Sequence, residues 1–125
     1  MFSVDKLTVK TSDGRNVTLV TEFTYTRKDG CIITIPAGST SDGASTPPAL
    51  WPTLPPFGAY WMAAFLHDYL YRCSGVDKAF CDETFLEAME CLGVEDPDRT
   101  VLYEGVHLLG WAAFREDREA QCSGC

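Results

Sequence analysis

The most apolar helical pattern in the chain is AYWMAAFLHDYLYRC, which runs from Ala59 to Cys73. Its large apolar residues fall on more than one side of the helix, and a helix that is apolar on most faces is typically buried. The main exceptions are His67 and Asp68, two polar residues in the middle of the pattern. We therefore expect a central helix that carries a polar pair into the core.

Two further helices are predicted on the C-terminal side of this one. The second covers Asp77–Leu92 and ends at Gly93, because glycine suits the position after a helix. The third opens at Asp96-Pro97, since proline fits the first helical position, and it runs to about Phe114. The helical part as a whole is expected to cover residues 59–121.

The residues on the N-terminal side indicate strands and then a loop. Val, Ile, Thr, Phe and Tyr are frequent there, as in strands, and Asp-Gly pairs separate the runs as hairpin turns do. Most of the prolines lie within residues 37–58, and so many helix and strand breakers exclude a regular element. The chain thus predicts one α+β domain over residues 1–125, whose residues 1–36 form a three-stranded antiparallel meander. The expected strands are Lys6–Lys10, Val17–Thr26 and Cys31–Ile35.

The composition narrows the possible partners and compartments. A net charge of -8 argues against a nucleic-acid binder, which needs a basic face. The chain has no apolar run long enough for a transmembrane segment and no signal-peptide pattern at its start, so the six cysteines are expected to be mostly reduced when the protein is made in a cytosol. The CxxC spacing of Cys122 and Cys125 suits a redox or metal-binding pair, or simply a frayed tail.

Asp68 needs a partner if its helix is buried, because an unpaired ionised carboxylate in a protein interior costs several kcal/mol. Arg72 lies one turn further along the helix and is one candidate. A cation shared with the Pro-rich loop is the other candidate. Adjacent helical positions differ by about 100°, so His67 and Asp68 can face different neighbours. The pair therefore suits a general base beside a metal ligand, or a buried polar pair that joins two elements.

Asp42 and Asp82 are the other candidate site residues. Asp42 lies in SDGAS, residues 41–45, where it can form an Asx-turn or, with loop carbonyls, an oxygen site for calcium. Asp82 can reach His67 if the first two helices are antiparallel neighbours, and a carboxylate on the far imidazole nitrogen fixes the tautomer and raises the basicity. Alternatively, Asp82 is a solvated acid near a helix N-terminus, where negative charge is favoured.

A series of short motifs extends from about residue 39 to Trp111. They are SDGAS (41–45), Pro48, WP (51–52), FG (57–58), AA (63–64), HDYLYR (67–72), and Asp82 with Phe85 and Ala88-Met89. In order and spacing they resemble a family of short phage and prophage proteins that is catalogued as domain of unknown function 1353. The resemblance implies a phage or prophage origin and no particular activity.

The loop Asp-Gly, the helical His-Asp and the later helical Asp also resemble, more distantly, the pattern of the bacterial and secreted phospholipases A2. In that family the His activates water, the next Asp and loop oxygens bind calcium, and the later Asp orients the His. The resemblance therefore implies that His67 and Asp82 are catalytic and that Asp42 and Asp68 bind calcium. The chain departs from that pattern because only Cys73 follows the helix motif, where the family has cysteines on both sides, and because the family has no clear counterpart of the N-terminal strands.

Two functions follow as hypotheses. The first is a metal-assisted, phospholipase-like hydrolase, with calcium as its cation, that a phage uses on host envelope lipid during lysis or while entering the cell. The second is a non-catalytic virion, tail or assembly protein, in which the His/Asp network fixes the fold and the partners are other phage virion proteins. A binding module, such as an inhibitor of host defence, is a third. The protein is expected in the host cytoplasm at synthesis, and a virion protein would end in the particle.

Overall fold

The computed structural model describes residues 1–11, 17–41, 60–74, 76–109 and 120–121. Antiparallel strands form the N-terminal part and three helices follow, so the predicted α+β class is confirmed. The expected Asp13-Gly14 turn and residues 42–58 of the Pro-rich loop lie outside the described residues.

The first sheet joins three short antiparallel strands in the order β1-β2-β5. Its first strand begins at Val9, three residues later than the predicted strand start at Lys6. The expectation that residues 37–58 contain no regular element is wrong at their beginning, where β5 pairs with β2. This short segment precedes the prolines that exclude strands further along. The strands are β1 (Val9–Thr11), β2 (Val17–Leu19) and β5 (Thr40–Ser41).

The second sheet is the antiparallel hairpin of β3 (Phe23–Thr26) and β4 (Ile32–Ile35). Its turn follows the predicted Asp-Gly chemistry, since Gly30 adopts a φ of 90° that other residues rarely reach. The prediction of one continuous strand over Val17–Thr26 is wrong, because the chain leaves the first sheet after Leu19 and enters the second at Phe23. Buried residues keep the same period of two on both sides of this break, so the pattern could not reveal it.

The three helices lie where the sequence predicts them, and residues 110–114 of the predicted third helix lie outside the described residues. α1 is buried along most of its length, as expected for a helix apolar on most faces. Asp77 caps α2 by accepting a hydrogen bond from the Phe80 amide at 2.7 Å, and Gly93 after the helix has a φ of 77°. The bounds are α1 Trp61–Tyr71, α2 Lys78–Cys91 and α3 Asp98–Leu109.

A short parallel pair of strands was not expected from the sequence. β6 (Cys73–Ser74) lies between α1 and α2 and pairs with β7 (Ala120–Gln121). The sequence predicts strands only within residues 1–36 and only antiparallel pairing, so this prediction is incomplete at this point. Two-residue strands have too little sequence for a periodic pattern, and their pairing depends on where the chain end returns.

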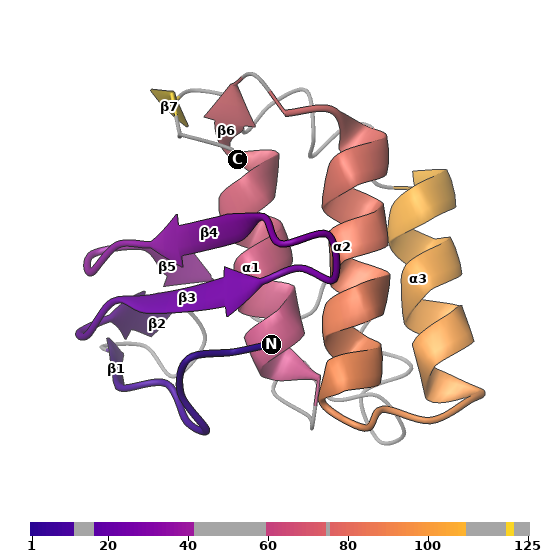
Figure 1. Cartoon of the computed structure of the whole chain (residues 1–125), viewed down its shortest axis with the longest axis horizontal. Helices are drawn as coiled ribbons and strands as arrows, with labels where there is room; N and C mark the ends of the chain where they lie inside the picture. Colours follow the sequence, from indigo (N-terminus) through magenta and orange to yellow (C-terminus); the bar gives the residue numbers. More distant parts are fainter. Residues whose placement is uncertain (12–16, 42–59, 75, 110–119, 122–125) are drawn as a thin grey trace.

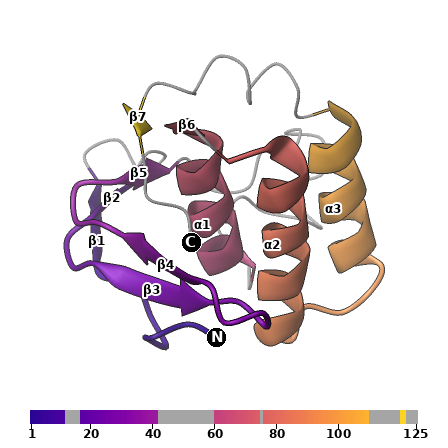
Figure 2. The same cartoon turned by 45° about the horizontal axis from the view of Figure 1, so that its top comes forward.

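The helices are arranged beside the strands in the order α1, α2, α3 (Figures 1 and 2). α1 contacts β5 on one side and α2 on the other, and α2 contacts α3. A continuous core of buried side chains joins both hairpin strands to α1 and α2. Among the described residues, no helix is both long and apolar enough to cross a membrane.

The expectation of reduced cysteines is only partly right. Cys31 and Cys73 each take part in a disulfide bond, whereas Cys81 and Cys91 do not. The redox state of a cellular compartment does not determine which sulfur atoms the fold brings together. Cys122 and Cys125 lie outside the described residues.

Candidate functional site

The centre of the site is a hydrogen bond between α1 and α2. His67 Nε2 lies 2.9 Å from Asp82 Oδ1. Both side chains are buried, with 5% of His67 and 1% of Asp82 exposed. The two candidate catalytic residues, which lie on separate helices, are therefore brought into direct contact. The alternative of a solvated Asp82 near the start of α2 is wrong, because packing of α1 on α2 covers it.

The contact defines the tautomer of His67. An ionised carboxylate can only accept hydrogen bonds, so Nε2 carries the proton and Nδ1 carries the lone pair. Burial lowers the pKa of the His67 imidazole below its ordinary value, and this effect outweighs the opposite influence of Asp82. A neutral imidazole with a free electron pair on Nδ1 is the form that a general base needs.

Asp82 accepts hydrogen bonds from two further groups besides His67, and a third group lies nearby. The Tyr71 hydroxyl donates to Oδ1 at 2.8 Å, and the Lys78 ammonium donates to Oδ2 at 2.6 Å. His107 Nδ1 lies 3.8 Å from Oδ2, which is too long for a hydrogen bond. Burial alone would raise the pKa of the Asp82 carboxyl, but hydrogen bonds from His67, Lys78 and Tyr71 together hold it below its usual range. Asp82 is therefore ionised at neutral pH despite its burial.

Lys78 is the residue of this network that the sequence analysis missed. It is the first residue of α2, yet only 5% of it is exposed. Lysine is almost never fully buried unless paired, so a lysine beside a helix start is ordinarily taken for a surface residue. The signal that could have found it is its spacing of four residues from Asp82, which places the two side chains on one helix face.

Aromatic rings enclose the imidazole of His67. The ring of Tyr71 lies 4.0 Å from it, centroid to centroid, and the ring of Phe85 lies 4.8 Å from it. These contacts fix the orientation of the imidazole and exclude water from most of its surface. The same burial raises the pKa of the Tyr71 hydroxyl, together with its hydrogen bond to Asp82, so this phenol stays protonated as a donor.

Asp68 is half-buried and points to a different neighbour from His67, as the helix geometry predicts. Its Oδ2 accepts a hydrogen bond from Ser41 Oγ at 2.5 Å. Arg72, the partner suggested by the sequence, instead donates to the carbonyl and hydroxyl oxygens of Thr40 at 2.7 and 2.9 Å. Asp68 therefore joins α1 to β5, at the residue that precedes Asp42.

Of the two residues expected to bind calcium, the structure describes Asp68 and not Asp42. Asp42 lies outside the described residues. Within the described part of the chain, no group of three or more His, Cys, Asp or Glu side chains is placed to hold a metal ion. Calcium takes six to eight oxygen ligands, so Asp68 and Ser41 could supply only a minority of them.

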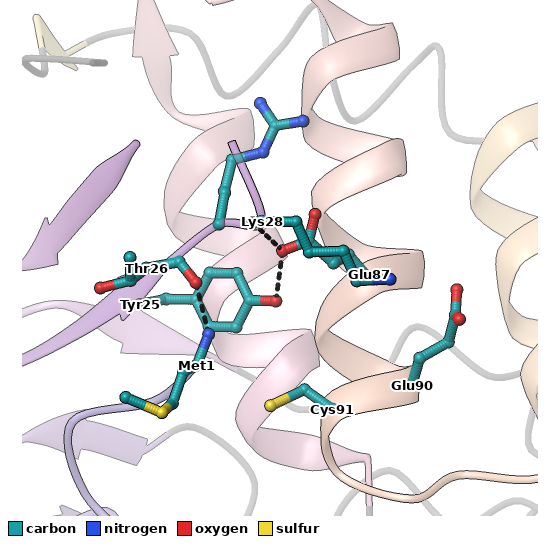
Figure 3. A pocket seen from close by; sticks show the side chains of 8 residues that line it. Met1, Tyr25, Thr26, Lys28, Glu87, Glu90 and Cys91 are labelled. Atoms are coloured by element: carbon teal, nitrogen blue, oxygen red, sulfur yellow. Dashed lines mark hydrogen bonds between the residues drawn. The ribbon is translucent and has the colours of Figure 1, made fainter. Parts of the chain in front are cut away.

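A shallow hollow of about 580 Å³ lies elsewhere on the surface. It is formed by Met1, the end of β3, the following turn and the C-terminal half of α2 (Figure 3). Asp82 lies in the N-terminal half of the same helix. One carboxylate oxygen of Glu87 accepts hydrogen bonds there from the Tyr25 hydroxyl at 2.8 Å and from the Lys28 amide at 2.9 Å. These bonds join the hairpin to α2, and the hollow is separate from the His67 site.

Comparison with known proteins identifies a family whose description names no activity. The family described as "Protein of unknown function (DUF1353)" matches residues 17–106. The matched region contains every strand from β2 to β6 and all of α1 and α2, including His67, Asp68, Lys78 and Asp82. No curated protein matches the chain. No solved structure matches it either. Because the family match covers more than half of the chain, the protein belongs to the DUF1353 family.

Proposed function

We propose that the protein is a hydrolase of ester bonds in which His67 acts as the general base and Asp82 orients it. The observation that carries this proposal is the 2.9 Å contact between His67 Nε2 and Asp82 Oδ1. A buried carboxylate on one imidazole nitrogen leaves the other nitrogen as a base of fixed direction. The lowered pKa of His67 supports the same role, because the base is then unprotonated at neutral pH.

The reaction is balanced by one proton that moves in two steps. His67 Nδ1 takes a proton from water while the water oxygen forms a bond to the ester carbonyl carbon. The bond from that carbon to the alcohol oxygen then breaks, and the leaving oxygen takes the proton from Nδ1. Between the two steps His67 is a cation, and the negative charge of Asp82 beside Nε2 stabilises it. The products are a carboxylic acid and an alcohol.

The resemblance to phospholipases A2 and to phage proteins supplies the finer parts of the proposal. The substrate would be a lipid ester of the host envelope, and a phage would use the enzyme during lysis or while entering the cell. Calcium at Asp68 and Asp42 belongs to the same proposal. A calcium ion would polarise the ester carbonyl when bound, and the described residues of its site, Asp68 and Ser41, offer oxygen ligands of the kind it prefers.

The burial of the polar network around Asp82 favours a second function. His67, Lys78 and Asp82 are each at most 5% exposed, and a fully satisfied polar network of this kind fixes the packing of helices. In that case the protein would be a non-catalytic virion, tail or assembly protein with other phage proteins as partners. The two functions differ in what the loss of His67 changes.

The test compares His67→Gln with His107→Gln in an ester-hydrolysis assay. The substrates are short-chain phospholipid micelles and a chromogenic ester, each with calcium or with a chelator. We expect the wild type to hydrolyse at least one of them and His67→Gln to lose about 10²–10⁴-fold in rate, as the loss of a general base does. His107 is half-exposed and outside hydrogen-bond distance of Asp82, so its variant should keep the wild-type rate.

The outcomes separate the two proposals. A wild type that hydrolyses neither substrate, with His67→Gln less stable by about 1–3 kcal/mol, would support the structural role. Calcium acts through Asp68 only if it raises the wild-type melting temperature by mass action and does not raise that of Asp68→Asn. No shift at millimolar calcium would remove calcium from the proposal and leave the His67 test unaffected.

A further inference from the structure

Lys78 makes an unusual set of contacts for a residue at the start of a helix. An ammonium group has three N–H donors. Lys78 Nζ donates to Asp82 Oδ2 at 2.6 Å, to the Val106 carbonyl at 2.8 Å and to the His107 carbonyl at 2.9 Å. Its geometry thus matches three acceptors from two helices.

The two carbonyl acceptors lie in the last turn of α3. The C-terminal end of a helix carries a partial negative charge. A buried cation is well suited to such a position. Lys78 therefore joins the Asp82 carboxylate to the C-terminal end of α3, and the network extends from α1 through α2 to α3.

We propose that Lys78 is a positioning residue of the site: its ammonium keeps the Asp82 carboxylate ionised and turned so that Oδ1 faces His67. The catalytic consequence of this role rests on the hydrolase function proposed above. Its effect on Asp82 does not, because that effect follows from the contacts within the protein.

The charges around Asp82 support this role. Among the described residues, the groups that face it are His67 and Tyr71 from α1, Lys78 from its own helix, and His107 and the neutral phenol of Tyr103 from α3. His67 and Tyr71 are neutral donors in the form described above. His107 is 50% exposed and lies 3.8 Å away. Lys78 is therefore the buried positive charge that balances Asp82 within the described residues, and without it a buried carboxylate would tend to take up a proton.

The two carboxylate oxygens of Asp82 have different partners, and this explains why protonation of Asp82 would change His67. Oδ1 accepts from His67 and Tyr71, whereas Oδ2 accepts from Lys78. A protonated Asp82 could donate its own hydrogen to Nε2 of His67. The imidazole proton would then move to Nδ1, and the site would lose the electron pair that takes the proton from water.

The experiment measures the Asp82 carboxyl directly, by a carbon-13 NMR titration of the side-chain carboxyl. It is performed on the full chain as wild type, Lys78→Met, Lys78→Gln and Lys10→Met. Lys10 is an exposed lysine of β1, so its variant removes the same charge far from the site. We expect the wild-type and Lys10→Met carboxyls to titrate below the usual range of aspartate, and both Lys78 variants to titrate at higher pH.

Two results would overturn the positioning role. The first is a wild-type Asp82 that titrates at or above the ordinary aspartate value of about 4. The second is an unchanged Asp82 titration in the Lys78 variants. If Lys78→Met does not fold, Lys78→Gln and the wild-type measurement still decide, because the amide retains hydrogen-bond donors but lacks the charge.

Hydrolysis rates separate this proposal from the hydrolase proposal. If the wild type is active, the Lys78 variants should lose about 10–100-fold in kcat with little change in KM, as the loss of an orienting partner does. Lys10→Met should keep the wild-type kcat. An inactive wild type would contradict the hydrolase function, whereas a shifted Asp82 titration would still support the role of Lys78.

Discussion

Asp82 serves two helices at once because its two oxygens face different neighbours. Oδ1 accepts from His67 and Tyr71 on α1, and Oδ2 accepts from Lys78, which also binds the end of α3. The sequence could predict the contact of His67 with Asp82, since it follows from two adjacent antiparallel helices. It could not predict the partner of Asp68, because Ser41 comes from a strand whose position depends on long-range pairing.

The protonation of His67 predicts how stability depends on pH. Its pKa is lowered in the folded protein, so below the ordinary value of about 6.5 the unfolded chain binds a proton that the native state excludes. The free energy of unfolding should therefore fall as pH decreases from 7.5 to 5.5, by at most about 1.4 kcal/mol per pH unit for this single proton. Asp82, whose pKa is also lowered, adds a further loss only at pH values near and below about 4.

Urea unfolding at pH 7.5 and 5.5 checks this dependence. His67→Gln should have a smaller difference between the two pH values than the wild type. Equal differences in the wild type and His67→Gln would show that His67 is not held neutral by the fold.

At the scale of elements, the helices were predictable and the strands were only partly so. α1 and α2 have clear local signals, namely a long apolar pattern, the Asp77 cap and Gly93. The strands are two to four residues long, and their pairing is decided by residues far away in the sequence. The single strand predicted over Val17–Thr26 shows the consequence, because its alternation continues across a change of sheet.

The cap of α2 offers a test at this scale. Asp77 accepts the Phe80 amide hydrogen at 2.7 Å, and Lys78 and Asp82 lie in the first turns that it fixes. We expect Asp77→Ala to lower the free energy of unfolding by about 1 kcal/mol, as removal of such caps typically does. Asp77→Asn should retain most of the stability, since its side-chain oxygen still accepts the bond. Equal losses in both variants would indicate that the charge of Asp77 matters rather than the cap.

For the whole molecule, the polar network lies where the three helices meet. α1 contacts β5 on one side and α2 on the other, and α2 separates α1 from α3 (Figures 1 and 2). Lys78 therefore connects the outermost helix to a dyad that lies on the face of α1 toward α2. This order of helices follows from short connections between consecutive elements, but the sequence alone did not indicate that one buried lysine would join them.

The disulfide-bonded cysteines give a prediction for the molecule as a whole. A disulfide stabilises a protein mainly by restricting the unfolded chain, and losing one typically costs about 2–5 kcal/mol. Cys73 is fully buried and bonded, whereas Cys91 is exposed and free. We expect Cys73→Ser to lower the free energy of unfolding by that amount and Cys91→Ser to change it little.

A reducing agent should lower the stability of the wild type and of Cys91→Ser alike. If the wild type unfolds at the same urea concentration with and without the reducing agent, the cysteines are reduced in the protein as made.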